Sequence, residues 1–161
     1  MGRGLRTIAS VFAATLAFAA VGDAAEGPTQ GEYVATVEPI CERNTIANRR
    51  ILAGARYKAN HGKRPAAGRQ FIRAANAFGK TTKAIKAVPR PPSYEVRLGR
   101  WTARLRVVEG NLRRTGRALK ADNLRRAIIG EVKLRSSALA ANNVVYDFDF
   151  RYCRLTPSRF N

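Results

Sequence analysis

Few side chains in this sequence could carry out catalysis or hold a metal ion. His61 is the only histidine, and the two cysteines are Cys41 and Cys153. A zinc site needs three or four such ligands close together, and a bundle haem protein needs an axial ligand, usually a histidine in the core. His61 instead precedes Gly62 in a predicted turn. The sequence therefore predicts no metal, haem or other cofactor.

Cys41 and His61 form the only cysteine–histidine pair available for nucleophilic catalysis. Along a continuous helix they would lie about 30 Å apart, so they would meet only if a break folded that helix back. The sequence also has no Gly-x-Ser-x-Gly motif and no phosphate-binding glycine loop. We therefore assign no catalytic residue.

Two pairs of carboxylates remain as candidates for acid–base chemistry. Glu38 and Glu42 would share a helix face, and Asp147 and Asp149 would share a face of an extended segment. Close carboxylates can raise one another's pKa. In a chain with 30 basic and 11 acidic residues, however, we favour a role for these acids in ion pairs with arginine. An enzyme with an unidentified acid pair is kept as the third hypothesis.

The N-terminus has the three parts of a secretory signal peptide. Arg3 and Arg6 are followed by an apolar run over 7–22 and by small residues at Gly22, Ala24 and Ala25. The run is shorter than the roughly 20 residues that a membrane-spanning helix needs. We expect a cleaved signal over 1–24, a mature domain over 25–161, and secretion or a place in the cell envelope. An uncleaved N-terminal membrane anchor is the alternative.

Export would place the two cysteines in an oxidising compartment. Disulfides persist in oxidising compartments, and a single pair of cysteines in an exported chain most simply forms one bridge. We therefore predict a disulfide between Cys41 and Cys153, with a free reactive cysteine as the alternative.

A capping box begins the first predicted helix. Thr29 and Glu32 have the spacing at which each side chain accepts a hydrogen bond from a backbone N–H at the helix start. Apolar residues then recur at steps of three and four until Gly62, which favours a helix end. Because Pro39 removes a backbone donor within this stretch, we expect a kink or a restarted helix there.

Three further helices follow. The second should run from Pro65 to Ala87 and end at the prolines of 88–92, which we interpret as a loop across one domain. Ser93 is the expected N-cap of the third helix. The stripe expected to be buried on the second helix comprises Phe71, Ala75, Phe78, Thr82 and Ile85. That on the third comprises Leu98, Trp101, Leu105, Val108, Leu112, Thr115 and Leu119. That on the fourth comprises Leu124, Ile128, Val132, Arg135, Leu139 and Asn142.

These patterns predict an all-α fold, a single four-helix bundle with up-down-up-down connectivity. The segment from Tyr146 to Cys153 alternates aromatic and charged residues, which is also a strand pattern, but no second strand is available to pair with it. We expect an extended C-terminal tail that lays Phe148 and Phe150 on the bundle and brings Cys153 to Cys41.

The net charge of +19 is the feature with the clearest bearing on function. Such an excess creates a field that collects anions. The cations are spread over all four helices, which fits diffuse attraction to a polyanion better than specific reading of nucleic-acid bases. The residues that we assign to polyanion binding lie on the third helix: Arg97, Arg100, Arg104, Arg106, Arg113, Arg114, Arg117 and Lys120.

The leading functional hypothesis is therefore a non-enzymatic protein that associates with an anionic envelope component, such as an acidic wall polymer or anionic lipid. A module that binds or inhibits a protein partner, with incidental charge, is the alternative. A soluble, highly solvated surface without a polyanion ligand also accounts for the charge.

Overall fold

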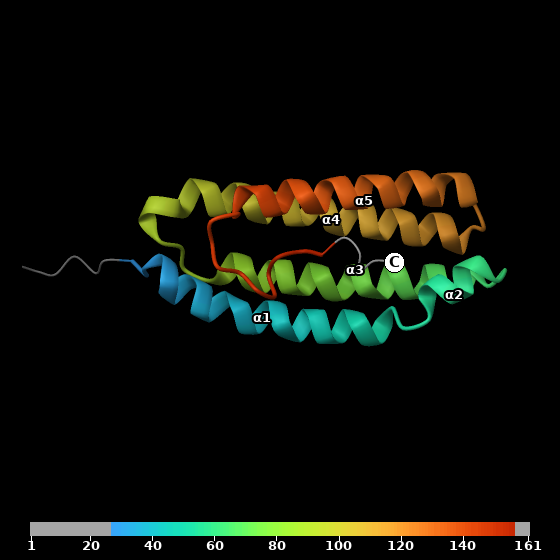
Figure 1. Cartoon of the computed structure of the whole chain (residues 1–161), viewed down its shortest axis with the longest axis horizontal. Helices are drawn as coiled ribbons and strands as arrows, with labels where there is room; N and C mark the ends of the chain where they lie inside the picture. The colour runs from blue at the N-terminus through green and yellow to red at the C-terminus, as the bar shows by residue number, and fades with distance from the viewer. Residues whose placement is uncertain (1–26, 157–161) are drawn as a thin grey trace, which may run out of the picture.

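The computed structural model describes residues 27–156, and within this range all regular secondary structure is helical. Four long helices are joined by a short helix, a 3-10 turn and connecting turns (Figure 1). Their bounds are α1 Gln30–Ile51, α2 Ala55–Asn60, α3 Arg64–Ala87, η1 Pro92–Tyr94, α4 Glu95–Lys120 and α5 Leu124–Val144. The predicted all-α class is confirmed. The segment assigned to the signal peptide, 1–24, lies outside the described residues.

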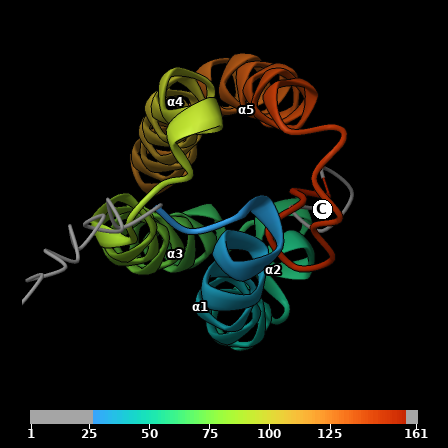
Figure 2. The same cartoon turned by 90° about the vertical axis from the view of Figure 1, so that its left-hand side faces the viewer.

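The helix α4 packs between α3 and α5, while α1 and α2 pack on α3. Viewed end-on, the tail that follows α5 passes between α5 and α1 (Figure 2). The C-terminal segment is thus part of the packed structure. Phe148 and Phe150 are buried, as the sequence predicted.

The start of α1 confirms the predicted capping box. Thr29 is the N-cap, its hydroxyl accepts from the backbone N–H of Glu32, and the Glu32 carboxylate accepts from the backbone N–H of Thr29 over 2.8 Å. The expected restart at Pro39 is wrong, because α1 continues through this residue to Ile51. The break comes instead before α2, where Gly54 takes a φ of +67°, a conformation that glycine adopts without strain.

The predicted stripes of the second and third helices are both buried. The helices α3 and α4 approach closely at Gly68, where an added Cβ would meet the backbone nitrogen of Lys120. Ser93 is not the N-cap of α4, because η1 includes Ser93 and the cap position falls on Tyr94.

The predicted buried face of the fourth helix is wrong. Five of its large aliphatic residues point outward, with exposed fractions of about one half, whereas mostly small residues and Leu134 face the bundle. A Cβ on Gly130 would come within 2.5 Å of the Thr115 hydroxyl oxygen, so the small face allows α5 to pack closely on α4. The buried residues are Ala127, Gly130, Leu134, Ser137, Ala138 and Ala141. The outward aliphatic face comprises Leu124, Ile128, Ile129, Val132 and Leu139.

Candidate functional site

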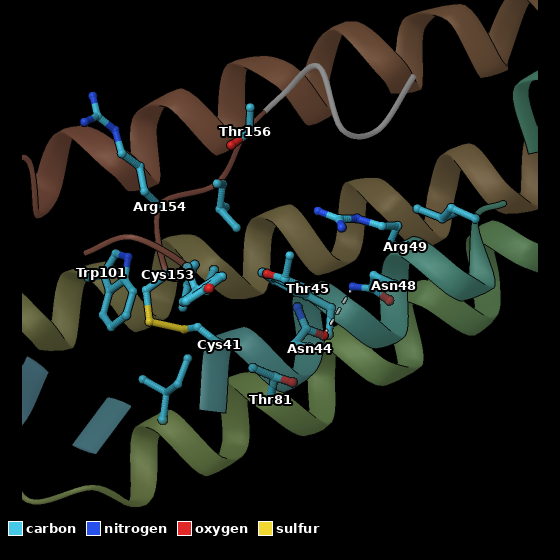
Figure 3. Close-up of a pocket in the computed structure, with 16 residues that line it drawn as sticks. Cys41, Asn44, Thr45, Asn48, Arg49, Thr81, Trp101, Cys153, Arg154 and Thr156 are labelled. Carbon is cyan, nitrogen blue, oxygen red and sulfur yellow. Dashed lines mark hydrogen bonds between the residues drawn. A yellow bond between two sulfur atoms is a disulfide. The ribbon is translucent and has the colours of Figure 1, made fainter. Parts of the chain in front are cut away.

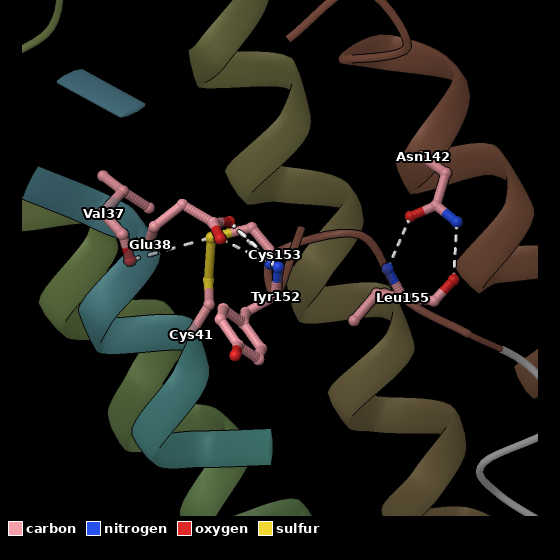
Figure 4. Close-up of a disulfide and its surroundings, with 7 residues drawn as sticks. All are labelled: Val37, Glu38, Cys41, Asn142, Tyr152, Cys153 and Leu155. Carbon is pink, nitrogen blue, oxygen red and sulfur yellow. Dashed lines mark hydrogen bonds between the residues drawn. A yellow bond between two sulfur atoms is a disulfide. The ribbon is translucent and has the colours of Figure 1, made fainter. Parts of the chain in front are cut away.

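The tail is bonded to α1 by a disulfide between Cys41 and Cys153 (Figure 4). One helical turn before Cys41, the Glu38 carboxylate accepts hydrogen bonds from the backbone N–H groups of Tyr152 and Cys153, the shortest at 2.9 and 3.0 Å respectively. A carboxylate that accepts backbone N–H bonds is a strong acceptor. Glu38 therefore acts as a clamp on the tail rather than as half of a catalytic pair.

Two further contacts hold the tail against the other side of the bundle. Asn142 on α5 exchanges two hydrogen bonds with the backbone of Leu155 (Figure 4). Arg97 on α4 donates to the Val144 carbonyl over 2.6 Å and to the Asp147 carboxylate over 2.8 Å. These hydrogen bonds from the Arg97 guanidinium hold the pKa of Asp147 below its ordinary value.

With α1, α3 and α4, the tail lines a pocket of about 250 Å³ (Figure 3). We call it the tail pocket. Its apolar side is lined by the disulfide and by buried side chains: Phe78, Ile85, Trp101 and Leu105. Polar side chains come from one face of α1 and from the end of the tail: Asn44, Thr45, Asn48, Arg49, Arg154 and Thr156.

Two buried polar atoms on residues that line the tail pocket have no hydrogen-bond partner among the described residues. They are Oδ1 of Asn48 and the indole Nε1 of Trp101. The amide nitrogen of Asn48 is used, because it donates to Asn44 over 3.2 Å (Figure 3). An unpartnered buried acceptor or donor costs about 1–3 kcal/mol.

The other candidates for chemistry are separated in the structure. His61 is exposed, stacks on Tyr57 and contacts the Tyr57 carbonyl through Nδ1 over 2.8 Å. Asp149, the other member of the second acid pair, is exposed while Asp147 binds Arg97. Among residues 27–156, no group of three or more histidine, cysteine, aspartate or glutamate side chains is placed to hold a metal ion.

Some of the eight cations assigned to polyanion binding have partners within the protein. Arg97 binds Asp147, and Arg113 donates to Glu109 over 2.8 Å. Arg114 is exposed and donates to Asn111. The other five are exposed and have no ion pair or side-chain hydrogen bond recorded within the described range: Arg100, Arg104, Arg106, Arg117 and Lys120.

Three grooves border α4, one of them only at its last residue, Lys120, and each is lined by four cations. The groove between α4 and α5, about 500 Å³ in volume, contains no acidic residue. A second, bordered by α2, α3 and α4, also has none, and a third between α3 and α4 contains Glu109. The α4–α5 groove cations are Arg114, Arg117, Arg126 and Lys133. Those of the second are Lys58, Arg69, Arg73 and Lys120, and those of the third are Lys80, Lys83, Arg106 and Arg113.

The α4 cations could be identified from the sequence, but the cations that share each groove with them and the tail pocket could not. Arg126 and Lys133 line the same groove as the α4 cations because their side of α5 faces α4. Which side of α5 faces α4 depends on the rotation of the helix about its own axis. The aliphatic Ile129 lines the same groove, which therefore borders the outward aliphatic face. In the described part of the chain, none of the helices is both long enough and apolar enough to span a membrane.

The chain was also compared with known proteins. No protein-family model matches it, and the searches of curated proteins and of solved structures likewise find no match.

Proposed function

We propose that the protein is an exported, non-enzymatic binding protein that associates with an anionic component of the cell envelope. The observation that carries this proposal is the gathering of four cations in each of three grooves that border α4, two of which contain no acid. Closely spaced cations attract a polyanion, and the counterions of the polyanion are released when it binds. The signal pattern over 1–24 and the disulfide both support export, because disulfides persist outside the reducing cytosol.

We infer in addition that the bundle has the up-down-up-down connectivity expected from the sequence. The short connections between α3 and α4 and between α4 and α5, together with the packing of α4 against both, support it (Figure 1).

The test is binding to heparin and to vesicles of phosphatidylglycerol as a function of salt. The logarithm of the association constant should fall with the logarithm of the salt concentration, with a slope of about −0.9 for each charge neutralised on a dense polyanion. Absence of binding to every polyanion at low salt would refute the proposal.

A quadruple variant of the α4–α5 groove separates the groove from the net charge. Its changes are Arg114→Gln, Arg117→Gln, Arg126→Gln and Lys133→Gln. The matched control changes four exposed cations outside the three grooves: Arg43→Gln, Arg50→Gln, Arg56→Gln and Lys86→Gln. Both variants lose four charges. We expect the groove variant to lose most of its heparin affinity and the control to lose much less; equal losses would contradict a role for the groove.

The outward aliphatic face of α5 supports the alternative function, binding of a protein partner. Side chains such as Ile128 and Val132 remain about half exposed, although burial of each would gain about 1.5–3 kcal/mol. The double change Ile128→Ser and Val132→Ser distinguishes the two functions. If this face enters an anionic bilayer, vesicle binding falls while heparin binding is kept; if it serves a protein partner, neither changes.

A further inference from the structure

We propose that the tail pocket binds a small amphipathic carboxylate, a ligand with an apolar body and an anionic head. This site is separate from the grooves that border α4, and the inference does not depend on polyanion binding. It rests on the volume and the lining of the pocket.

The volume and the apolar side of the pocket determine the body of the ligand. At about 250 Å³ the pocket lies just below the usual range of sites for drug-sized molecules, which begins near 300 Å³. Phe78, Ile85 and Leu105 present hydrocarbon, and the Trp101 ring is fully buried at one side. A short alkyl chain or one aromatic ring fits such a surface, whereas a sugar or a free phosphate would leave it without apolar contact.

The polar side of the pocket determines the head of the ligand. Arg49 is exposed, and its side chain extends toward the middle of the lining residues (Figure 3). Arg154, on the tail, also lines the pocket, and no acidic side chain is among the lining residues. Because both charged groups of the lining are cations, a carboxylate fits this end of the pocket and an ammonium group does not.

The contacts that anchor the tail hold this wall of the pocket in place. Cys153 and Leu155, which line the pocket, are fixed by the disulfide, by Glu38 and by Asn142. These contacts pull the tail toward α1 on one side and α5 on the other. A pocket wall held in this way pre-organises the site and lowers the entropic cost of binding.

The single tryptophan of the chain provides a direct measurement, because Trp101 lines the pocket. The oxidised protein is titrated with octanoate, octanol and octylammonium while tryptophan emission is followed, and calorimetry gives the stoichiometry. We expect one-to-one saturable binding, strongest for octanoate, weaker for octanol, and absent for octylammonium. No saturable change with any probe, or equal binding of the cation and the carboxylate, would overturn the proposal.

Two variants locate the site. Arg49→Gln should weaken octanoate binding by about tenfold or more, in line with loss of a charge-assisted hydrogen bond, and should leave octanol binding unchanged. The neighbouring Arg50→Gln, which removes the same charge from an exposed position outside the pocket, should change neither. Equal weakening by both variants would contradict the assignment. Thr45→Phe should block all probes, provided its thermal melting confirms a folded protein.

Discussion

The amide of Asn142 and the backbone of Leu155 hydrogen-bond to each other in both directions: the side-chain nitrogen donates to the carbonyl over 2.6 Å, and the backbone N–H donates to the side-chain oxygen over 2.9 Å. The side chain thereby satisfies both backbone groups of a residue that belongs to no regular element. We expect Asn142→Ala to lower the free energy of unfolding by about 1–3 kcal/mol, because two partly buried groups lose their partners.

Urea unfolding measures this change, and Asn143→Ala serves as the control. Asn143 is the next residue on α5, is exposed and has no side-chain hydrogen bond recorded within the described range. Its substitution should change stability by less than about 0.5 kcal/mol. If Asn142→Ala is equally mild, the tail is held by its other contacts alone.

Tyr33 should tolerate loss of its hydroxyl group. The side chain is fully buried and its oxygen has no partner among the described residues. We therefore expect Tyr33→Phe to leave stability at pH 7 unchanged or to raise it by up to about 1 kcal/mol, since an unsatisfied polar group leaves the core. A loss of stability of more than about 1 kcal/mol in Tyr33→Phe would show that the hydroxyl has a hydrogen-bond partner.

The same variant has a second effect at alkaline pH. Burial raises the pKa of Tyr33 from 10.0 to about 12, against a smaller opposing effect of Arg90. Between these values the unfolded chain releases the phenolic proton and the folded chain retains it, so wild-type stability falls as pH rises from 10 to 12. Tyr33→Phe removes this contribution. Chemical denaturation at pH 9 to 12 should show the advantage of the variant growing with pH.

Gly68 should be intolerant of any side chain. An alanine Cβ would meet the backbone of Lys120 and Gly116 at distances below 3 Å, and backbone atoms cannot yield as a flexible side chain can. We expect Gly68→Ala to destabilise by about 1–3 kcal/mol or more, the usual cost of overpacking. Thermal melting measures the loss.

Gly110→Ala is the matched control for Gly68→Ala on the facing helix. The nearest atoms to its Cβ are the end of the Arg114 side chain at 3.7 Å, which is ordinary contact. Because alanine has a higher helix propensity than glycine, this variant should gain about 0.5–1 kcal/mol. Opposite signs for the two variants would support the close contact; equal effects would contradict it.

The ion pair between Arg97 and Asp147 predicts an acid dependence. Arg97 holds the pKa of Asp147 below its ordinary value of 3.8, so the folded state keeps this carboxylate ionised where the unfolded chain is protonated. The stabilisation is complete above pH 3.8 and is lost as pH falls through the lowered value. The stability difference between wild type and Asp147→Asn should therefore be constant near neutral pH and shrink in acid. Asp149→Asn, at an exposed position two residues on, is the control.

The sequence predicted the packing of α3 and α4 well because their large apolar residues coincide with the buried face. On α5 the same reasoning chose the wrong face. The stripe of Leu124, Ile128 and Val132 is helical in period, but the contact with α4 is made by small residues such as Gly130 and Ala138. Hydrophobic periodicity identifies a helix. It does not identify which side of the helix faces the core when one side carries small residues and another carries large apolar ones.

The site was predictable only in part for a related reason. The pairing of Cys41 with Cys153 followed from their number and the expected export. The tail pocket did not, because Asn48 and Arg49 belong to a helix face that becomes a pocket only when the tail lies over it. For Glu38 we expected an ion pair with arginine, whereas its carboxylate accepts hydrogen bonds from the backbone N–H groups of Tyr152 and Cys153.

The disulfide also has a consequence for the order of assembly. Synthesis begins at the N-terminus, so Cys41 emerges 112 residues before its partner. The helices that the structure describes are all made before Cys153 exists, and a chain interrupted before Cys153 retains an unpaired thiol at Cys41 and lacks one side of the tail pocket. Oxidation of this pair thus marks a polypeptide that has been translated past α5, and it distinguishes that polypeptide from one interrupted earlier.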